Sequence, residues 1–162
     1  MKRLLSLGVV SLFIGMTAIT LSGNQDHDVN DGVRDRFVGA WRLAWLEEEG
    51  ADGNHRADCT GLLVYTRDGH MSVQVMYRNP QANPQAAANA SAVQYVQGGY
   101  EASFGTYEID ERAHNFTFHV EGALVRTLIG KDLTRVFHFS GKQLIVKSSG
   151  PDEHWRVAWE HY

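Results

Sequence analysis

From residue 37 onward, apolar and polar residues alternate in short runs, which is the pattern of β-strands with one buried face. The clearest run covers residues 71–77, where polar Ser72 and Gln74 separate the apolar positions. The apolar positions of this run share one face of the predicted strand: Met71, Val73, Val75 and Tyr77. Asp68-Gly69 comes directly before the run and favours a hairpin turn, so residues 62–65 are predicted to pair with it.

The first strand is predicted over residues 37–46, with Trp41, Leu43 and Trp45 on one face. Residues 47–56 are charged and glycine-containing, so a polar loop is predicted there. In all, eight strands are predicted: residues 37–46, 62–65, 71–77, 102–109, 115–121, 132–140, 143–148 and 155–160. Sequential strands joined by short turns predict an all-β fold, an eight-stranded antiparallel up-and-down barrel. A barrel of this size either holds one small ligand or is filled by its own side chains.

One segment breaks the strand pattern. Residues 79–92 contain two Asn-Pro pairs and six alanines. Because alanine has the highest helix propensity, a short helix over residues 85–95 is one interpretation, and it would lie as a lid over the cavity mouth. A plain surface loop is the other interpretation, and both stay open.

The N-terminal region has the features of an export signal. Lys2 and Arg3 precede an apolar run of residues 4–21, and small residues end the run at Ser22 and Gly23. We therefore predict a signal peptide over residues 1–23, a flexible polar tail over residues 24–35 and one domain over residues 36–162. The protein is expected to be exported, either to the periplasm or outside the cell. An uncleaved membrane anchor is the less favoured alternative, and no stable membrane insertion is expected after cleavage.

Composition excludes several classes of function. The 162 residues include 15 basic and 19 acidic side chains, for a net charge of −4, so no basic patch for nucleic acid is predicted. The single cysteine, Cys59, excludes an internal disulfide and a cysteine-based zinc site. The eight histidines have no metal-ligand spacing, and no metal or other cofactor is predicted.

Several motifs occur in an order that resembles one known family. Residues 37–43 resemble the Gly-x-Trp opening strand of lipocalins, and further similar segments follow: residues 61–74, residues 104–110, residues 119–122, Gly130, Arg135 and Trp159-Glu160. In this order they are similar to the bacterial and fungal lipocalin-like domain proteins over residues 37–161. The resemblance implies a calycin-type barrel with an interior cavity, and it does not imply one activity.

Candidate ligand-binding residues follow from the strands and from the resemblance. A pocket lining of aromatic and flexible side chains with a few hydroxyls is predicted from one set: Tyr65, Met71, Val73, Val75, Tyr77, Tyr100 and Tyr107. His119, Glu121 and Arg135 match family positions. If their faces point inward, they form a polar cluster in the cavity. Hydropathy favours the other face of residues 115–121, which would leave His119 and Glu121 in rim or surface pairs.

A structural set is also implied by the resemblance. In lipocalins a cation of the closing strand packs on the tryptophan of the opening strand, so Arg156 is expected over Trp41, with Trp159 on the same closing strand. Gly39 is expected to allow a close approach of backbone or ring.

Two functions of different classes, and a blander third, follow. The favoured hypothesis is a non-enzymatic carrier whose partner is a small hydrophobic or amphipathic molecule in the barrel. The alternative is a cyclase or isomerase acting on a small hydrophobic intermediate, with His119, Glu121 and Arg135 as acid, base and anchor. A filled barrel without a ligand is the third. The sequence does not determine the oligomeric state.

Overall fold

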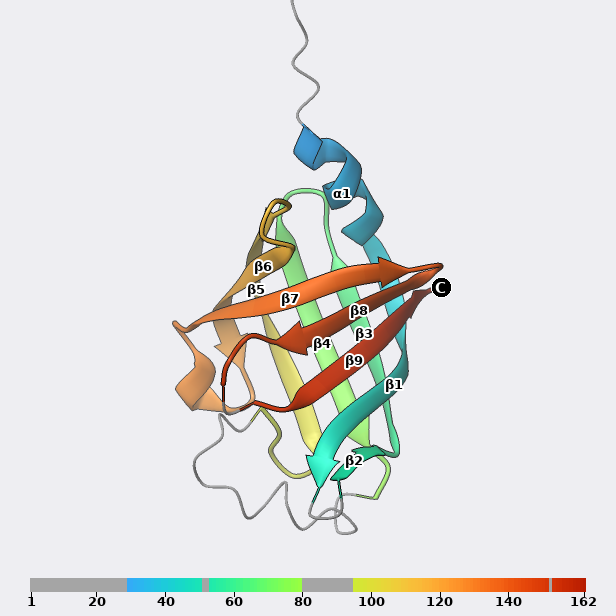
Figure 1. The fold of residues 1–162 in the computed structure, drawn as a ribbon. Coiled ribbons are helices and arrows are strands. Elements are labelled where there is room, and N and C mark those ends of the chain that lie inside the picture. The colour runs from blue at the N-terminus through green and yellow to red at the C-terminus, as the bar shows by residue number, and fades with distance from the viewer. Residues whose placement is uncertain (1–28, 51–52, 80–94, 152) are drawn as a thin grey trace, which may run out of the picture.

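A computed structural model of the chain describes residues 29–50, 53–79, 95–151 and 153–162 (Figure 1). The helices are α1 (Val29–Phe37) and a short 3-10 helix, η1 (Arg126–Leu128). The strands are β1 (Gly39–Gly50), β2 (Gly53–Arg56), β3 (Cys59–Tyr65), β4 (His70–Tyr77), β5 (Tyr100–Asp110), β6 (Asn115–Ala123), β7 (Asp132–Ser140), β8 (Gln143–Ser148) and β9 (Trp155–His161). The predicted signal peptide and nearly all of the predicted lid helix lie outside the described residues.

The strands form one antiparallel sheet that closes on itself. Neighbours follow the order β2-β1-β3-β4-β5-β6-β7-β8-β9, and β1 also pairs with β9. Leu43 of β1 lies opposite Trp159 of β9 at this closure. β2 pairs with the far end of β1 only, so eight strands make the barrel and β2 extends it. The predicted eight-stranded antiparallel barrel is confirmed.

β1 contains a bulge that changes which side chains point inward. Its pairing with β9 shifts between Leu43 and Trp45, so Ala44 is an extra residue without a partner on β9. As a result Trp41 and Leu46 are both buried, whereas Trp45 is only half-buried. The prediction that Trp41 and Trp45 share one face is therefore wrong, because strict alternation ends at the bulge.

Residues 47–56 are not the polar loop that their composition predicted. β1 continues to Gly50 and pairs with β2, with Glu47 opposite Arg56 and Glu49 opposite Asn54. The four residues of β2 are all exposed, so this hairpin buries no apolar face. An exposed hairpin leaves no hydrophobic alternation in the sequence, which is the signal the prediction relied on.

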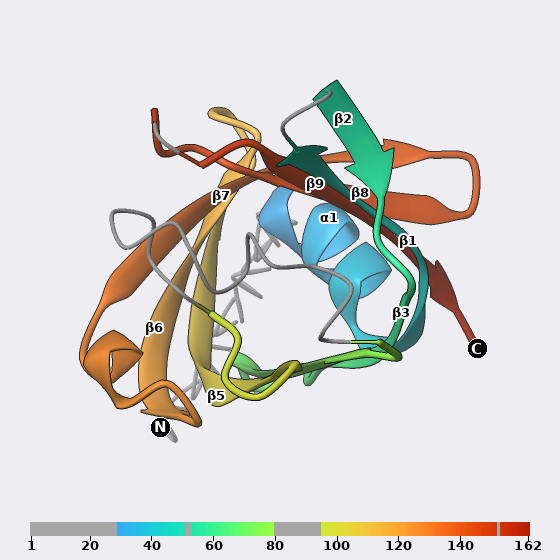
Figure 2. The same cartoon turned by 90° about the horizontal axis from the view of Figure 1, so that it is seen from below.

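Residues 29–35 belong to a helix rather than to the predicted flexible tail, and Phe37 ends that helix instead of opening the first strand. Figure 1 shows α1 at one end of the barrel, and Figure 2 shows it lying across the opening there. Phe37 is fully buried, and its ring lies 4.9 Å from Phe137 and 5.0 Å from Tyr65. Trp41 Nε1 donates a 2.7 Å hydrogen bond to the Phe37 carbonyl oxygen. The helix thus closes this end with an aromatic plug.

Candidate functional site

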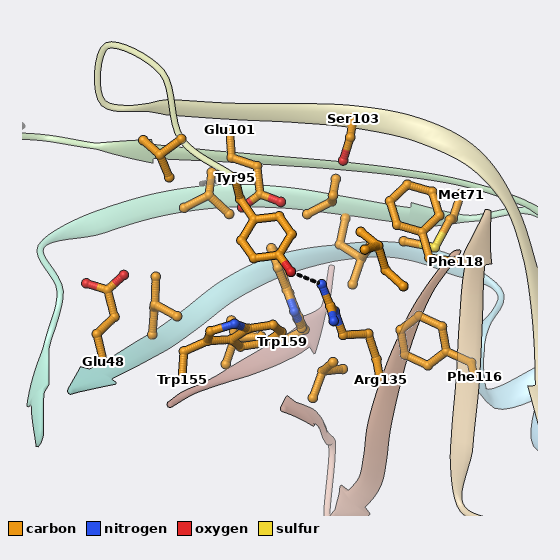
Figure 3. A pocket seen from close by; sticks show the side chains of 18 of the residues that line it. Glu48, Met71, Tyr95, Glu101, Ser103, Phe116, Phe118, Arg135, Trp155 and Trp159 are labelled. Atoms are coloured by element: carbon orange, nitrogen blue, oxygen red, sulfur yellow. Dashed lines mark hydrogen bonds between the residues drawn. The ribbon is translucent and has the colours of Figure 1, made fainter. Parts of the chain in front are cut away.

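A cavity of about 140 Å³ lies inside the barrel. Its walls are mostly apolar and come from strands all around the barrel, including Leu46, Leu63, Phe116, Phe118, Leu133, Val146, Val157 and Trp159. Figure 3 shows the polar side chains that reach into this apolar space. A cavity with such walls and few polar groups is the usual form of a small-molecule site.

Six of the ten predicted ligand-binding residues line this cavity: Tyr65, Met71, Val73, Val75, Tyr77 and Arg135. Tyr107 is buried at the α1 end, where its hydroxyl donates a 3.0 Å hydrogen bond to the Thr66 carbonyl oxygen. Tyr100 is exposed. Neither of these two tyrosines lines the cavity.

His119 and Glu121 do not line the cavity either. The inward face of β6 carries Phe116, Phe118 and Val120, as hydropathy favoured. His119 Nδ1 lies 2.7 Å from Asp132 Oδ1 on the outside of the barrel. The inward positions of β6 are even-numbered, so His119 and Glu121 point outward, whereas Arg135 of the neighbouring strand β7 points into the cavity. The three side chains are therefore not assembled in one place.

Arg135 is the centre of a buried polar network. Its Nη2 donates a 2.6 Å hydrogen bond to Tyr95 Oη, and its Nη1 donates to the Thr134 carbonyl oxygen at 3.1 Å. Its guanidinium carbon lies 5.1 Å from the ring centroids of both Tyr95 and Trp155 (Figure 3). The guanidinium thus contacts two neighbouring aromatic rings, whose centroids are 6.4 Å apart, and such contacts favour a desolvated cation.

Glu153 balances the charge of Arg135. One carboxylate oxygen lies 3.7 Å from Arg135 Nη1, and the same oxygen accepts hydrogen bonds from Ser148 Oγ at 2.7 Å and Trp155 Nε1 at 3.2 Å. Burial acts to raise the pKa of Glu153, but the Ser148 hydrogen bond, the Arg135 charge and the bonds from Tyr95 and Trp155 together hold this pKa below its usual value. Glu153 therefore stays ionised beside the guanidinium.

Two further polar side chains, Glu101 and Ser103 of β5, line the cavity. Burial raises the pKa of Glu101 to about 7, and the charge of Arg135 limits this rise. Sequence reasoning missed both residues, and it missed Tyr95, Trp155 and Glu153 as well. For β5 a signal was present, because Ser103, Gly105 and Tyr107 occupy the buried odd-numbered face. For Tyr95 no alternation precedes the residue, so the sequence offered no comparable signal.

A family model described as a lipocalin-like domain matches residues 38–160. The chain belongs to the lipocalin-like domain family. Among solved structures it is similar to a lipocalin-like protein from Bacteroides uniformis, at 14% sequence identity and a TM-score of 0.44, over 78% of this chain and 99% of that chain. No curated protein matches the chain.

The opening strand of this lipocalin-like domain departs from the expected packing. Arg156 forms hydrogen bonds to Glu47 through Nε at 3.1 Å and Nη2 at 3.0 Å, and its guanidinium carbon lies 5.6 Å from a ring centroid of Trp45. The expected Arg156–Trp41 contact is thus replaced, because the bulge turns Trp45 outward, on the side where Arg156 lies.

The ring that lies against Trp41 is that of His161, with 3.6 Å between the ring centroids. Gly39 allows this approach, since it has a φ of 138° and a Cβ there would lie 2.6 Å from His161 Cε1. Trp159 is buried and lines the cavity, in addition to its place at the barrel closure.

In the part of this lipocalin-like protein that the structure describes, residues 29–50, 53–79, 95–151 and 153–162, neither a metal-binding cluster nor a membrane-spanning helix is present. No group of three or more His, Cys, Asp or Glu side chains is placed to hold a metal ion. No helix in the same part of the chain has the length and apolar character needed to cross a membrane.

Proposed function

We propose that this lipocalin-like protein is exported and binds a small, mainly apolar molecule inside its barrel. The observation that supports ligand binding is the cavity of about 140 Å³, whose walls are mostly apolar and whose polar groups are few and grouped. A filled barrel would leave no such space. Of the three residues that an enzyme was expected to use, only Arg135 lines this cavity, so catalysis is not proposed.

The volume sets the size of the ligand. An apolar protein cavity of about 150 Å³ is large enough to take up benzene. Burial of a ring-sized molecule removes about 150–200 Å² of apolar surface from water, which corresponds to roughly 4–5 kcal/mol and a Kd of about 1 mM or below. We therefore propose a single-ring molecule or an aliphatic molecule of equal size rather than a long-chain lipid.

Export is supported by the N-terminal sequence alone. The basic residues Lys2 and Arg3, the apolar run of residues 4–21 and the small residues that follow it are typical of a cleaved signal peptide. The site of action would then be the periplasm or the cell exterior.

Ligand binding is tested with two matched variants on β4. Val75 lines the cavity, whereas its neighbour Met76 is 47% exposed. We expect Val75→Phe to fill the cavity and to weaken the binding of benzyl alcohol at least tenfold in calorimetric titration. Met76→Phe adds a similar ring on the outer face and should leave binding within about twofold of the wild type. Circular dichroism checks that both variants fold, since overpacking costs about 1–3 kcal/mol. Equal binding by both variants, or no binding by the wild type, would refute the proposal.

A further inference from the structure

Two polar side chains of β5 line the cavity without a hydrogen bond to any described residue. Glu101 and Ser103 are two residues apart on β5, so they share one face of the strand. Figure 3 shows both side chains directed into the cavity from the same wall. Within the described part of the chain, no hydrogen bond joins either side chain to another residue, and Ser103 is only 5% exposed. No fully buried side-chain nitrogen or oxygen in the described residues lacks a hydrogen-bond partner, so the polar atoms of these two side chains remain accessible from the cavity, where a ligand can bind them.

Arg135 is less suited to bind an anionic ligand, because its guanidinium already has partners in the protein. Its two terminal nitrogens already donate to Tyr95 and to the Thr134 carbonyl oxygen, and the adjacent carboxylate of Glu153 balances its charge. Its guanidinium carbon also lies 5.1 Å from the ring centroids of Tyr95 and Trp155. A carboxylate ligand would have to compete with Glu153 for this cation, at a site where the balance of charge is already met.

We propose that the ligand is a small amine, whose ammonium group donates hydrogen bonds to the Glu101 carboxylate and the Ser103 hydroxyl while its apolar part fills the cavity. This inference rests on the proposed function, because it names the chemical class of the molecule that the barrel binds. An ammonium group has three donors and no acceptor, which matches a carboxylate and a hydroxyl on one strand face. Hydrogen bonds between ionised partners are about twice as strong as those between neutral ones.

The other charged groups around the cavity agree with a cationic ligand. Glu101 faces the interior together with Glu48 of β1 and Arg135 of β7. Glu48 accepts a hydrogen bond from the Tyr77 hydroxyl, and Arg135 is paired with Glu153. Glu101 is thus the carboxyl group that an arriving cation would neutralise. Its neutralisation would remove the cost that burial now places on the ionised carboxylate.

Three probes of equal size separate the possible ligand classes: benzylamine, benzyl alcohol and benzoate. At pH 8 we expect the wild type to bind benzylamine at least tenfold more tightly than benzyl alcohol, and benzoate more weakly than either. Glu101→Gln keeps the shape of the side chain but removes its charge, so the preference for the amine should fall to within about twofold. Ser103→Ala should reduce the preference by a smaller factor, because the carboxylate remains.

Glu108→Gln is the matched control, since Glu108 is on the same strand with an 81% exposed side chain and should leave the preference unchanged. Benzyl alcohol binding by Glu101→Gln verifies that this variant keeps its cavity. Equal affinities for the amine and the alcohol, tighter binding of benzoate, or a full amine preference in Glu101→Gln would each overturn the inference while leaving the proposed function intact. Failure of all three probes to bind would instead refute the proposed function.

Discussion

Replacement of Glu101 by glutamine is expected to stabilise the protein, by an amount that grows with pH. In the folded protein the pKa of Glu101 is about 7, against an ordinary value of 4.5, because the carboxyl group is buried in the cavity. Between these two pH values the folded state keeps a proton that the unfolded state has lost. The free energy of unfolding of the wild type therefore falls as pH rises through this window.

The size of the effect follows from the pKa difference. Each unit corresponds to 1.36 kcal/mol, so the shift from 4.5 to about 7 gives at most about 3 kcal/mol above pH 7. Water that enters the cavity lowers this figure, and we expect about 1–3 kcal/mol. Glutamine does not ionise, so the variant should lack this part of the pH dependence.

Urea denaturation at pH 4.5, 6 and 8 measures the effect, for the wild type, Glu101→Gln and the exposed control Glu108→Gln. Contributions of other groups, such as Glu153 with its lowered pKa, occur in all three proteins and cancel in the differences. The gain in stability of Glu101→Gln over the wild type should be larger at pH 8 than at pH 4.5 by about 1–3 kcal/mol. A gain that is the same at all three pH values, or that shrinks as pH rises, would show that Glu101 does not have a raised pKa in the folded protein.

Three further predictions concern Phe37 in the aromatic plug, Gly39 at the start of β1 and cleavage of the N-terminus. Phe37→Ala should lower the free energy of unfolding by about 3–5 kcal/mol in urea titrations, since Phe37 is fully buried among aromatic rings; a loss below 1 kcal/mol would show that α1 does not stabilise the barrel. Gly39→Ala should lower the melting temperature more than Gly141→Ala, because both positions have positive φ but only Gly39 lies against the His161 ring; equal losses would contradict this. N-terminal sequencing of the exported protein should find cleavage near Ser22-Gly23, and an intact Met1 would contradict the export signal.

The barrel itself was predictable because each of its strands buries one face. Alternation in β4 predicted that Met71, Val73, Val75 and Tyr77 face inward, and all four side chains line the cavity. Short turns between successive strands then left few alternatives to an antiparallel meander.

The bulge and the helix were not predictable in the same way. Ala44 carries no mark that distinguishes it from an ordinary strand residue, yet it reverses the facing of every residue after it in β1. The segment Val29–Phe37 contains Gly32 and lacks a strong helical pattern, so its helix depends on tertiary contacts of Phe37 with the barrel.

The site was predictable only in part, because the strands differ in whether their odd-numbered or their even-numbered residues face inward. In β6 the inward residues are even-numbered, and in β5 and around Arg135 in β7 they are odd-numbered. His119 and Arg135 both have odd numbers, but His119 faces the outside of the barrel and Arg135 faces the inside. The contact of Tyr95 with Arg135 spans 40 residues, and sequence spacing gives no indication of it.

Ligand binding by this protein requires an accessible apolar space inside the barrel. Crystallography under xenon pressure tests it directly, because xenon enters empty apolar cavities of this size without needing any polar contact. We expect a xenon atom inside the barrel, near Val75, Phe118 and Trp159. A barrel interior that remains free of xenon, with side chains filling the space between these three residues, would contradict it.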